Sequence, residues 1–228
     1  MSNDANDLEE ALKLLKLDKD IACKQKLKDY INLLFKWHEK NNILSTRDKK
    51  YFIQRDMYDS LSILGYLPQG NLLDVGTGAG IPGILLSFFM TNKIILLDRR
   101  QNAIRFLEHA KLKLGINNVR IIKSDINEMN IEHSLSCVLI KNFSNKIVSK
   151  LSFEDKISYI VNVIRKRVHE SIPIFILTGS NALKTEDFSS VLKKSLRSDF
   201  IVTKIQTPFF DTNRYLLEIR YVWNTSRC

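Results

Sequence analysis

The chain has 228 residues, of which 44% are hydrophobic and 26% charged, and its formal net charge is +10. This length suits a substantial hydrophobic core, with or without a small appended unit. No apolar run reaches the ~18 residues of a membrane-spanning helix, and the acidic, polar start of the chain does not resemble a secretory signal. We therefore expect a cytoplasmic protein without a membrane partner.

Helical periodicity dominates the first 70 residues. Apolar residues recur every three or four positions, and helices are expected at residues 7–17, 20–38 and 50–64. Asp7 with Glu10 matches a capping box at the start of the first helix. We predict that residues 1–70 form a helical cap and that residues 71–228 form a cofactor-binding domain.

A glycine-rich stretch follows the predicted cap. Residues 72–83 read Leu-Leu-Asp-Val-Gly-Thr-Gly-Ala-Gly-Ile-Pro-Gly, which indicates a strand, a loop with Gly76, Gly78 and Gly80, and a helix from Pro82 to Met90. Glycine tolerates positive φ and lets a ligand approach the backbone, and the helix would direct its first N–H groups at that ligand. The pattern predicts a loop that binds an adenosine-containing cofactor.

Asp98 closes the next apolar run, 22 residues after Gly76, where an acidic side chain can accept hydrogen bonds from ribose hydroxyls. Two alternatives stay open at this point. Asp98 could cap the following helix, since Gln101 completes a capping-box pattern. The glycines also match the G-x-G-x-x-G pattern of dinucleotide-binding proteins.

Apolar runs and helical patterns alternate in the rest of the chain. Strands are expected at residues 71–75, 93–97, 119–122, 135–140 and 172–177, followed by a helix at 187–197 and a hairpin of residues 200–206 and 214–223. This order predicts an α/β, Rossmann-like class I methyltransferase fold with a mostly parallel sheet and a C-terminal antiparallel hairpin. Asp125-Ile-Asn127 follows the third strand, where it could meet an adenine ring or form an ordinary turn.

Several segments resemble the bacterial RsmG (GidB) family, which methylates guanine N7 in small-subunit (16S) ribosomal RNA with S-adenosylmethionine. The glycine block at residues 72–83 is the most specific of them. The others are Leu96-Leu-Asp98, Arg105-Phe-Leu107, Trp37-His-Glu-Lys-Asn-Asn-Ile-Leu-Ser-Thr46, Asp59-Ser60-Leu61 and Arg214-Tyr-Leu-Leu-Glu-Ile-Arg220. The resemblance covers roughly residues 25 to 222.

The resemblance implies S-adenosylmethionine as cofactor and small-subunit ribosomal RNA, or a small-subunit particle, as partner. It also implies a set of cofactor-binding residues, namely Gly76, Gly78, Gly80, Ile81, Asp98, Ile126, Asn127 and Lys141. Some positions depart from the family. Lys141 stands where an arginine is usual, Asp56 where a histidine is usual, and Ile126-Asn127 where the family has Val-Glu or Ala-Glu. Lysine keeps the positive charge of arginine but loses its planar fork.

Methyl transfer to guanine N7 needs no general base, because N7 carries no proton, so we assign no catalytic residue. The positive charge is concentrated in residues 131–228, where the excess is +6. Such a surface favours RNA, although a solvated lysine-rich surface is equally compatible with the charge. A non-catalytic RNA-binding protein and a nicotinamide-dependent oxidoreductase remain the alternative functions.

The cysteines are widely spaced, which predicts free thiols and no metal site. They are Cys23, Cys137 and Cys228. We expect a monomer.

Overall fold

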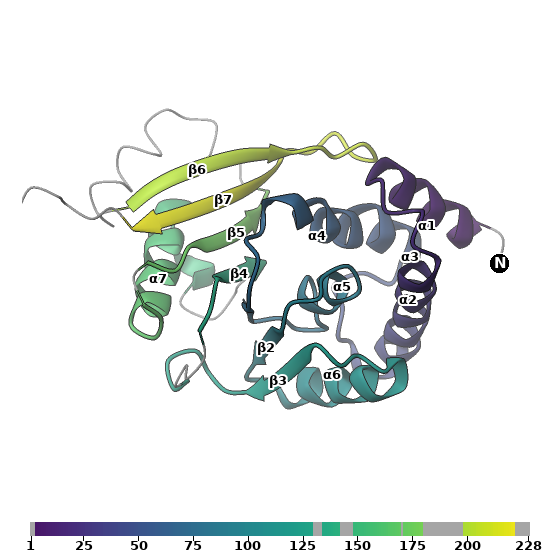
Figure 1. Cartoon of the computed structure of the whole chain (residues 1–228), viewed down its shortest axis with the longest axis horizontal. Helices are drawn as coiled ribbons and strands as arrows, with labels where there is room; N and C mark the ends of the chain where they lie inside the picture. Colours follow the sequence, from purple (N-terminus) through teal and green to yellow (C-terminus); the bar gives the residue numbers. More distant parts are fainter. Residues whose placement is uncertain (1–2, 130–133, 142–147, 170, 180–197, 222–228) are drawn as a thin grey trace, which may run out of the picture.

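The computed structural model describes residues 3–129, 134–141, 148–169, 171–179 and 198–221 (Figure 1). Its N-terminal part is helical, as predicted. The helices are α1 (Asn3–Leu14), α2 (Ile21–Asn41), α3 (Lys49–Tyr51), the π-helical η1 (Phe52–Met57), α4 (Tyr58–Ser62) and the short 3-10 turn η2 (Leu64–Tyr66). α3, η1 and α4 follow one another without a break, so the predicted third helix contains a wide turn in its middle.

The predicted capping box of the first helix is wrong. α1 begins at Asn3, so Asp7 and Glu10 lie inside the helix. The Asp7 carboxylate faces the third helix, where its Oδ1 atom lies 3.3 Å from Lys50 Nζ. α2 is capped by Asp20, whose side chain accepts a hydrogen bond from the Cys23 amide at 2.9 Å.

The sheet has seven strands in the order β3-β2-β1-β4-β5-β7-β6, with β7 antiparallel to both of its neighbours. The strands are β1 (Leu72–Val75), β2 (Ile94–Asp98), β3 (Val119–Lys123), β4 (Cys137–Lys141), β5 (Ile174–Thr178), β6 (Ser198–Ile205) and β7 (Arg214–Tyr221). This topology confirms the predicted fold class. The helix predicted at residues 187–197 lies outside the described residues.

Helices cover both faces of the sheet, because side chains along each buried strand alternate between two hydrophobic clusters. Leu72 and Ile94 face the cluster formed with the N-terminal helices, α5 (Gly83–Ser87) and α6 (Gln101–Leu114). Leu73 and Ile95 face the other cluster, which includes α7 (Phe153–Arg165). Figure 1 shows α7 on the opposite side of the sheet from the N-terminal helices.

Residues before and after position 70 contribute to the same cluster, which contains Leu12 and Leu34 as well as Leu72 and Leu139. The domain boundary at residue 70 stays a prediction. Cys23 and Cys137 are free thiols, as predicted. Cys228 lies outside the described residues.

Candidate functional site

The sites predicted from the sequence meet at the carboxyl edge of the parallel strands. β1 lies between β2 and β4, and all three run in the same direction. Gly76 follows β1, Asp98 ends β2 and Lys141 ends β4. The connections from β1 and β4 leave in opposite directions across the sheet, and at such a point a crevice for a ligand is expected.

The glycine loop has the backbone that its sequence predicts. Gly76, Gly78 and Gly80 have φ values of 71°, 60° and 87°, a region that residues with a Cβ rarely adopt. The amides of Gly76 and Thr77 donate to Leu97 O at 2.8 and 3.1 Å, which joins the loop to β2. The loop is therefore held in a left-handed path beside the end of β2.

The amides at the start of the helix after the loop have partners within the protein, and their contact with a ligand stays a prediction. The amides of Gly80 and Ile81 donate to Thr77 O at 2.9 and 3.0 Å, and the amide of Ile84 donates to Gly80 O at 2.7 Å. The helix also ends at Ser87, before the predicted Met90. The side-chain amide of Asn118 donates to Ser87 O and Met90 O, so a distant residue satisfies carbonyls at this end.

Asp74, on the buried strand before the loop, organises the turn from beneath. Its Oδ2 atom accepts hydrogen bonds from Thr77 Oγ1 at 2.6 Å and from the Gly83 amide at 2.8 Å. A Cβ on Gly83 would lie 2.2 Å from Leu96 Cδ2 and 2.7 Å from Asp74 Oδ2. Gly83 thus permits a close approach of the helix to the sheet, and Asp74 ties both ends of the loop together.

Asp74 should make the stability of the protein depend on pH. Burial raises the pKa of its carboxyl to about 6, although the Thr77 and Gly83 hydrogen bonds oppose the rise. Between the usual pKa and this value the folded state binds more protons than the unfolded chain, so the free energy of unfolding falls as pH rises. Asp74→Asn removes this titration. We expect the stability of the wild type relative to Asp74→Asn to decrease from about pH 4 to about pH 6 in urea unfolding and to change little at higher pH; a pH-independent difference would contradict the assignment.

Asp98 lies directly against the glycine loop. Its Oδ2 atom accepts a hydrogen bond from the Gly78 amide at 2.9 Å, and the residue is only 4% exposed. Burial raises the pKa of this carboxyl, but hydrogen bonds from Arg100 and Gly78 outweigh that effect and hold the pKa below its usual value. Asp98 is therefore an ionised acceptor beside the loop, as its predicted contact with a ribose requires.

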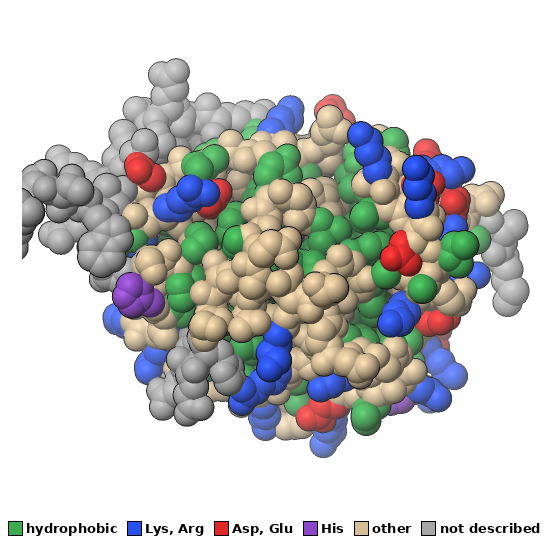
Figure 2. All heavy atoms as spheres, in the orientation of Figure 1, with side chains coloured by type: hydrophobic (Ala, Val, Ile, Leu, Met, Phe, Trp, Pro, Cys, Tyr) green, Lys and Arg blue, Asp and Glu red, His purple; other side chains and the backbone are tan. Residues whose placement is uncertain are grey.

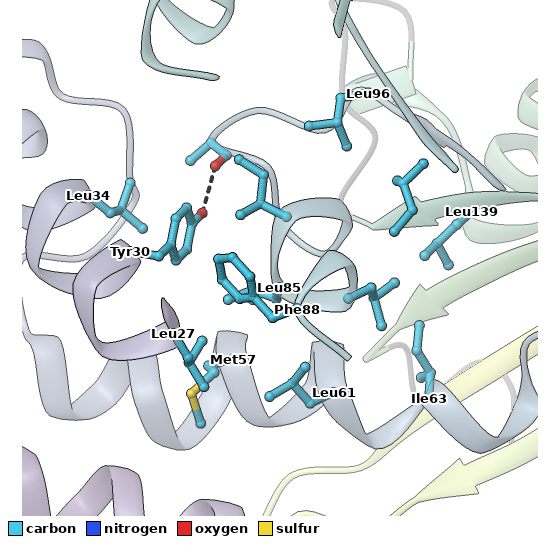
Figure 3. Close-up of a cluster of buried hydrophobic side chains, with 14 of the residues drawn as sticks. Leu27, Tyr30, Leu34, Met57, Leu61, Ile63, Leu85, Phe88, Leu96 and Leu139 are labelled. Atoms are coloured by element: carbon cyan, nitrogen blue, oxygen red, sulfur yellow. Dashed lines mark hydrogen bonds between the residues drawn. The ribbon is translucent and has the colours of Figure 1, made fainter. Parts of the chain in front are cut away.

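Tyr30, on α2, connects the N-terminal helices to the same loop. Its hydroxyl donates to Ala79 O at 2.6 Å, and the side chain is fully buried (Figure 3). Phe88 and Phe106 pack against the ring, with centroids 6.0 and 6.1 Å away. Tyr30 thus fixes the position of one peptide of the glycine loop.

Removing this hydroxyl should loosen the loop. Tyr30→Phe leaves Ala79 O without its donor in a buried place, and we expect a loss of about 1 to 2 kcal/mol in the free energy of unfolding. We also expect weaker binding of the cofactor product S-adenosylhomocysteine, because the loop must be held for binding. The matched control is Tyr66→Phe, since Tyr66 is 49% exposed. Equal effects of the two substitutions would show that the buried bond has no special role.

The segment after β3 is divided between core and surface. Ile126 is 4% exposed and packs in the cluster that includes α7. Asn127 is exposed, and its amide and side chain both donate to Asp125 Oδ1, at 3.0 and 2.9 Å. The segment forms a compact turn after β3, at the carboxyl edge of the sheet, and contact of Ile126 and Asn127 with adenine stays a prediction.

Lys141 enters a buried cluster of charges between β4 and the third N-terminal helix. Its Nζ atom donates to Asp56 O at 2.9 Å and to Ser60 Oγ at 3.2 Å, and it lies 3.2 Å from Asp56 Oδ1. The side chain is only 5% exposed. Lys141 therefore points into the protein and not into solvent, and contact of Lys141 with the cofactor stays a prediction.

Further ion pairs extend this cluster. Arg55 Nη2 lies 2.6 Å from Asp56 Oδ2, and Arg214 Nε lies 2.9 Å from Asp59 Oδ2. Burial raises the pKa of Asp56, but Lys141 and Arg55 outweigh it and hold that pKa below its usual value. Burial lowers the pKa of Lys141, and the charges of Asp56 and Asp59 offset only part of this decrease. The cluster therefore joins the N-terminal helices to β4 and to the start of β7.

The structure brings the predicted loop residues and Asp98 into direct contact. Ile81 continues this loop. Lys141 ends β4, which lies beside β1, and the Ile126–Asn127 segment follows β3, which lies beside β2. Sequence reasoning missed Asp74, Tyr30 and Arg100. Only Asp74 had a local signal, because a carboxylate inside an otherwise apolar strand requires hydrogen-bond donors nearby.

Comparison with known proteins identifies the family. Residues 23–161 match the family model described as rRNA small subunit methyltransferase G. A protein named ribosomal RNA small subunit methyltransferase G from Shewanella sp. is 29% identical over 216 residues, which cover 93% of this chain and 96% of the relative. One with the same name from Methylobacillus flagellatus is 32% identical over 154 residues, covering 65% of this chain and 75% of the relative.

Solved structures agree in fold. The glycopeptide N-methyltransferase MtfA complexed with sinefungin superimposes with a TM-score of 0.59 at 10% identity, covering 74% of this chain and 87% of that structure. A SAM-dependent methyltransferase from Aquifex aeolicus gives a TM-score of 0.52 at 14% identity, covering 82% of this chain and 98% of that structure. These structures share the fold, and the family model, which matches more than half of the chain, shows that the chain belongs to the rRNA small subunit methyltransferase G family.

Proposed function

We propose that the Gly76–Gly80 loop and Asp98 bind S-adenosylmethionine and that the methyl group goes to N7 of a guanine. The protein is an S-adenosylmethionine-dependent methyltransferase of small-subunit (16S) ribosomal RNA, as its family membership indicates. The observation that carries the site proposal is the contact between the Gly78 amide and Asp98 Oδ2, which joins loop and acid at one edge of the sheet.

The residues of this edge fit the cofactor. An ionised carboxylate can accept hydrogen bonds from the ribose diol. The left-handed glycines leave the backbone without side chains where a ligand must approach it, and Gly78 is partly exposed. Ile81, Ile126, Asn127 and Lys141 are proposed to complete the cofactor site, in agreement with the sequence resemblance.

The chemistry requires alignment rather than proton transfer. When bound, S-adenosylmethionine would supply an electrophilic sulfonium methyl group. The guanine N7 lone pair would form the new N–C bond, and the electron pair of the broken S–C bond would stay on sulfur. The rigid loop, tied to Asp74 and Tyr30, would hold the reacting groups in line. The buried site residues need not titrate for this transfer.

Surface charge supports a polyanionic substrate. The chain carries a net charge of +10, and Figure 2 shows Lys and Arg side chains mostly around the periphery of the face viewed. Such charges attract RNA phosphates regardless of sequence. In the described residues no helix is long and apolar enough to cross a membrane. A ribosomal RNA or small-subunit particle as substrate is consistent with the proposed cytoplasmic location.

The test combines binding with mapping. S-adenosylhomocysteine should raise the melting temperature while NAD should not. Asp98→Ala should weaken the binding of S-adenosylhomocysteine by roughly 1 to 3 kcal/mol in calorimetric titration. Small-subunit RNA from cells with and without the protein should differ at one N7-methylguanine. RNA binding without any methyl transfer would favour the non-catalytic alternative instead.

A further inference from the structure

Arg100 occupies the acceptors that a ribose would need. Its amide and Nε donate to Asp98 Oδ1 at 2.8 and 3.1 Å, and its Nη2 donates to Asp98 Oδ2 at 3.0 Å. The Gly78 amide makes the fourth hydrogen bond. A carboxylate offers about four lone-pair positions, so the whole acceptor capacity of Asp98 is used.

The Arg100 guanidinium also lies over the glycine loop. A Cβ built on Gly78 would meet Arg100 Nη2 at 3.1 Å, so this group stands directly above the loop backbone. Of the four donors to Asp98, the two backbone amides belong to the loop and to the start of α6. Only the two side-chain bonds can be released without unfolding either element.

We propose that Arg100 competes with the cofactor ribose for Asp98 and, once displaced, binds a phosphate of the RNA substrate. This inference rests on the proposed function of Asp98. The Arg100 side chain is 60% exposed, so its guanidinium can turn away from Asp98 into solvent. Arg99 is equally exposed, but it pairs with Asp125 at 3.4 Å instead of with Asp98.

A coupling between the two ligands follows. Ribose binding and phosphate binding both require that Arg100 leave Asp98, so each ligand favours the conformation that the other needs. Without RNA, the protein then binds the cofactor more weakly than it would if Arg100 did not contact Asp98. RNA should restore this affinity, and the cofactor should in turn strengthen RNA binding by the same factor.

The experiment compares Arg100→Met with Arg99→Met, which removes the same charge one residue away. In calorimetric titration Arg100→Met should bind S-adenosylhomocysteine about three- to tenfold more tightly than the wild type, and Arg99→Met should not differ. In an Asp98→Ala background Arg100→Met should have no effect, because the competition acts through that carboxylate. A 16S ribosomal RNA transcript should bind the wild type several-fold more tightly with S-adenosylhomocysteine present, and Arg100→Met should lose this gain.

The outcomes separate the inference from the proposed function. If Arg100→Met binds S-adenosylhomocysteine as tightly as the wild type or more weakly, the proposed competition is wrong. If the RNA affinity of the wild type does not change when S-adenosylhomocysteine is present, the proposed coupling is wrong. If instead the wild type does not bind S-adenosylhomocysteine, or Asp98→Ala binds it equally well, the cofactor site itself is misassigned.

Discussion

Gly78→Val should abolish cofactor binding while the protein stays folded. Gly78 has a φ of 60°, which strains a β-branched residue by about 1 to 2 kcal/mol. The new side chain would also project over the loop, where its first carbon already approaches Arg100 Nη2 at 3.1 Å. We expect no detectable heat in titration with S-adenosylhomocysteine.

Gly115 provides a matched control for backbone strain. It has a φ of 58°, and a Cβ there meets nothing within 4 Å. It ends α6, at the other edge of the sheet from the loop. Gly115→Val should therefore cost similar stability and leave S-adenosylhomocysteine affinity unchanged. Equal loss of binding in both variants would mean that strain, and not occupation of the site, causes the effect.

The second large effect is expected at Lys141. Lys141→Met removes the ammonium group that contacts Asp56 and Ser60. The Lys141 side chain is only 5% exposed, so this contact is buried. Breaking a buried ion pair on one side leaves the partner charge poorly compensated, so we expect a loss of about 3 kcal/mol in the free energy of unfolding by urea. The substitution should also separate the N-terminal helices from the cofactor edge and lower methyl transfer.

Two further variants test the origin of this loss. Lys204 lies on strand β6 and is exposed, so Lys204→Met should change stability by no more than ~0.5 kcal/mol. Adding Asp56→Asn to Lys141→Met should recover part of the stability, because it removes the carboxylate left behind. No recovery in the double variant would show that lost packing, rather than charge, dominates.

The sequence predicts best what depends on neighbours along the chain. The left-handed glycines, the acid that ends β2 and the parallel sheet with its final hairpin all follow from local residue patterns, and the structure has them. The contact of Tyr30 with Ala79 spans 49 positions and that of Lys141 with Asp56 spans 85, and neither leaves a periodic trace. The capping box is wrong for a different reason, because α1 already begins at Asn3, before Asp7.

The wide turn of η1 has a consequence for insertions and deletions. A π-helix spaces its hydrogen bonds one residue further apart than an α-helix, so η1 carries extra residues within an otherwise regular helix. Each residue of an α-helix advances by about 100° around the axis, so deleting one residue from a regular helical turn would rotate Asp59 and Ser60 away from Arg214 and Lys141. A deletion between Phe52 and Met57 would instead convert the wide turn to α-helical spacing and largely keep the direction of these side chains. One-residue deletions should therefore be tolerated better within η1 than in the helical turns beside it.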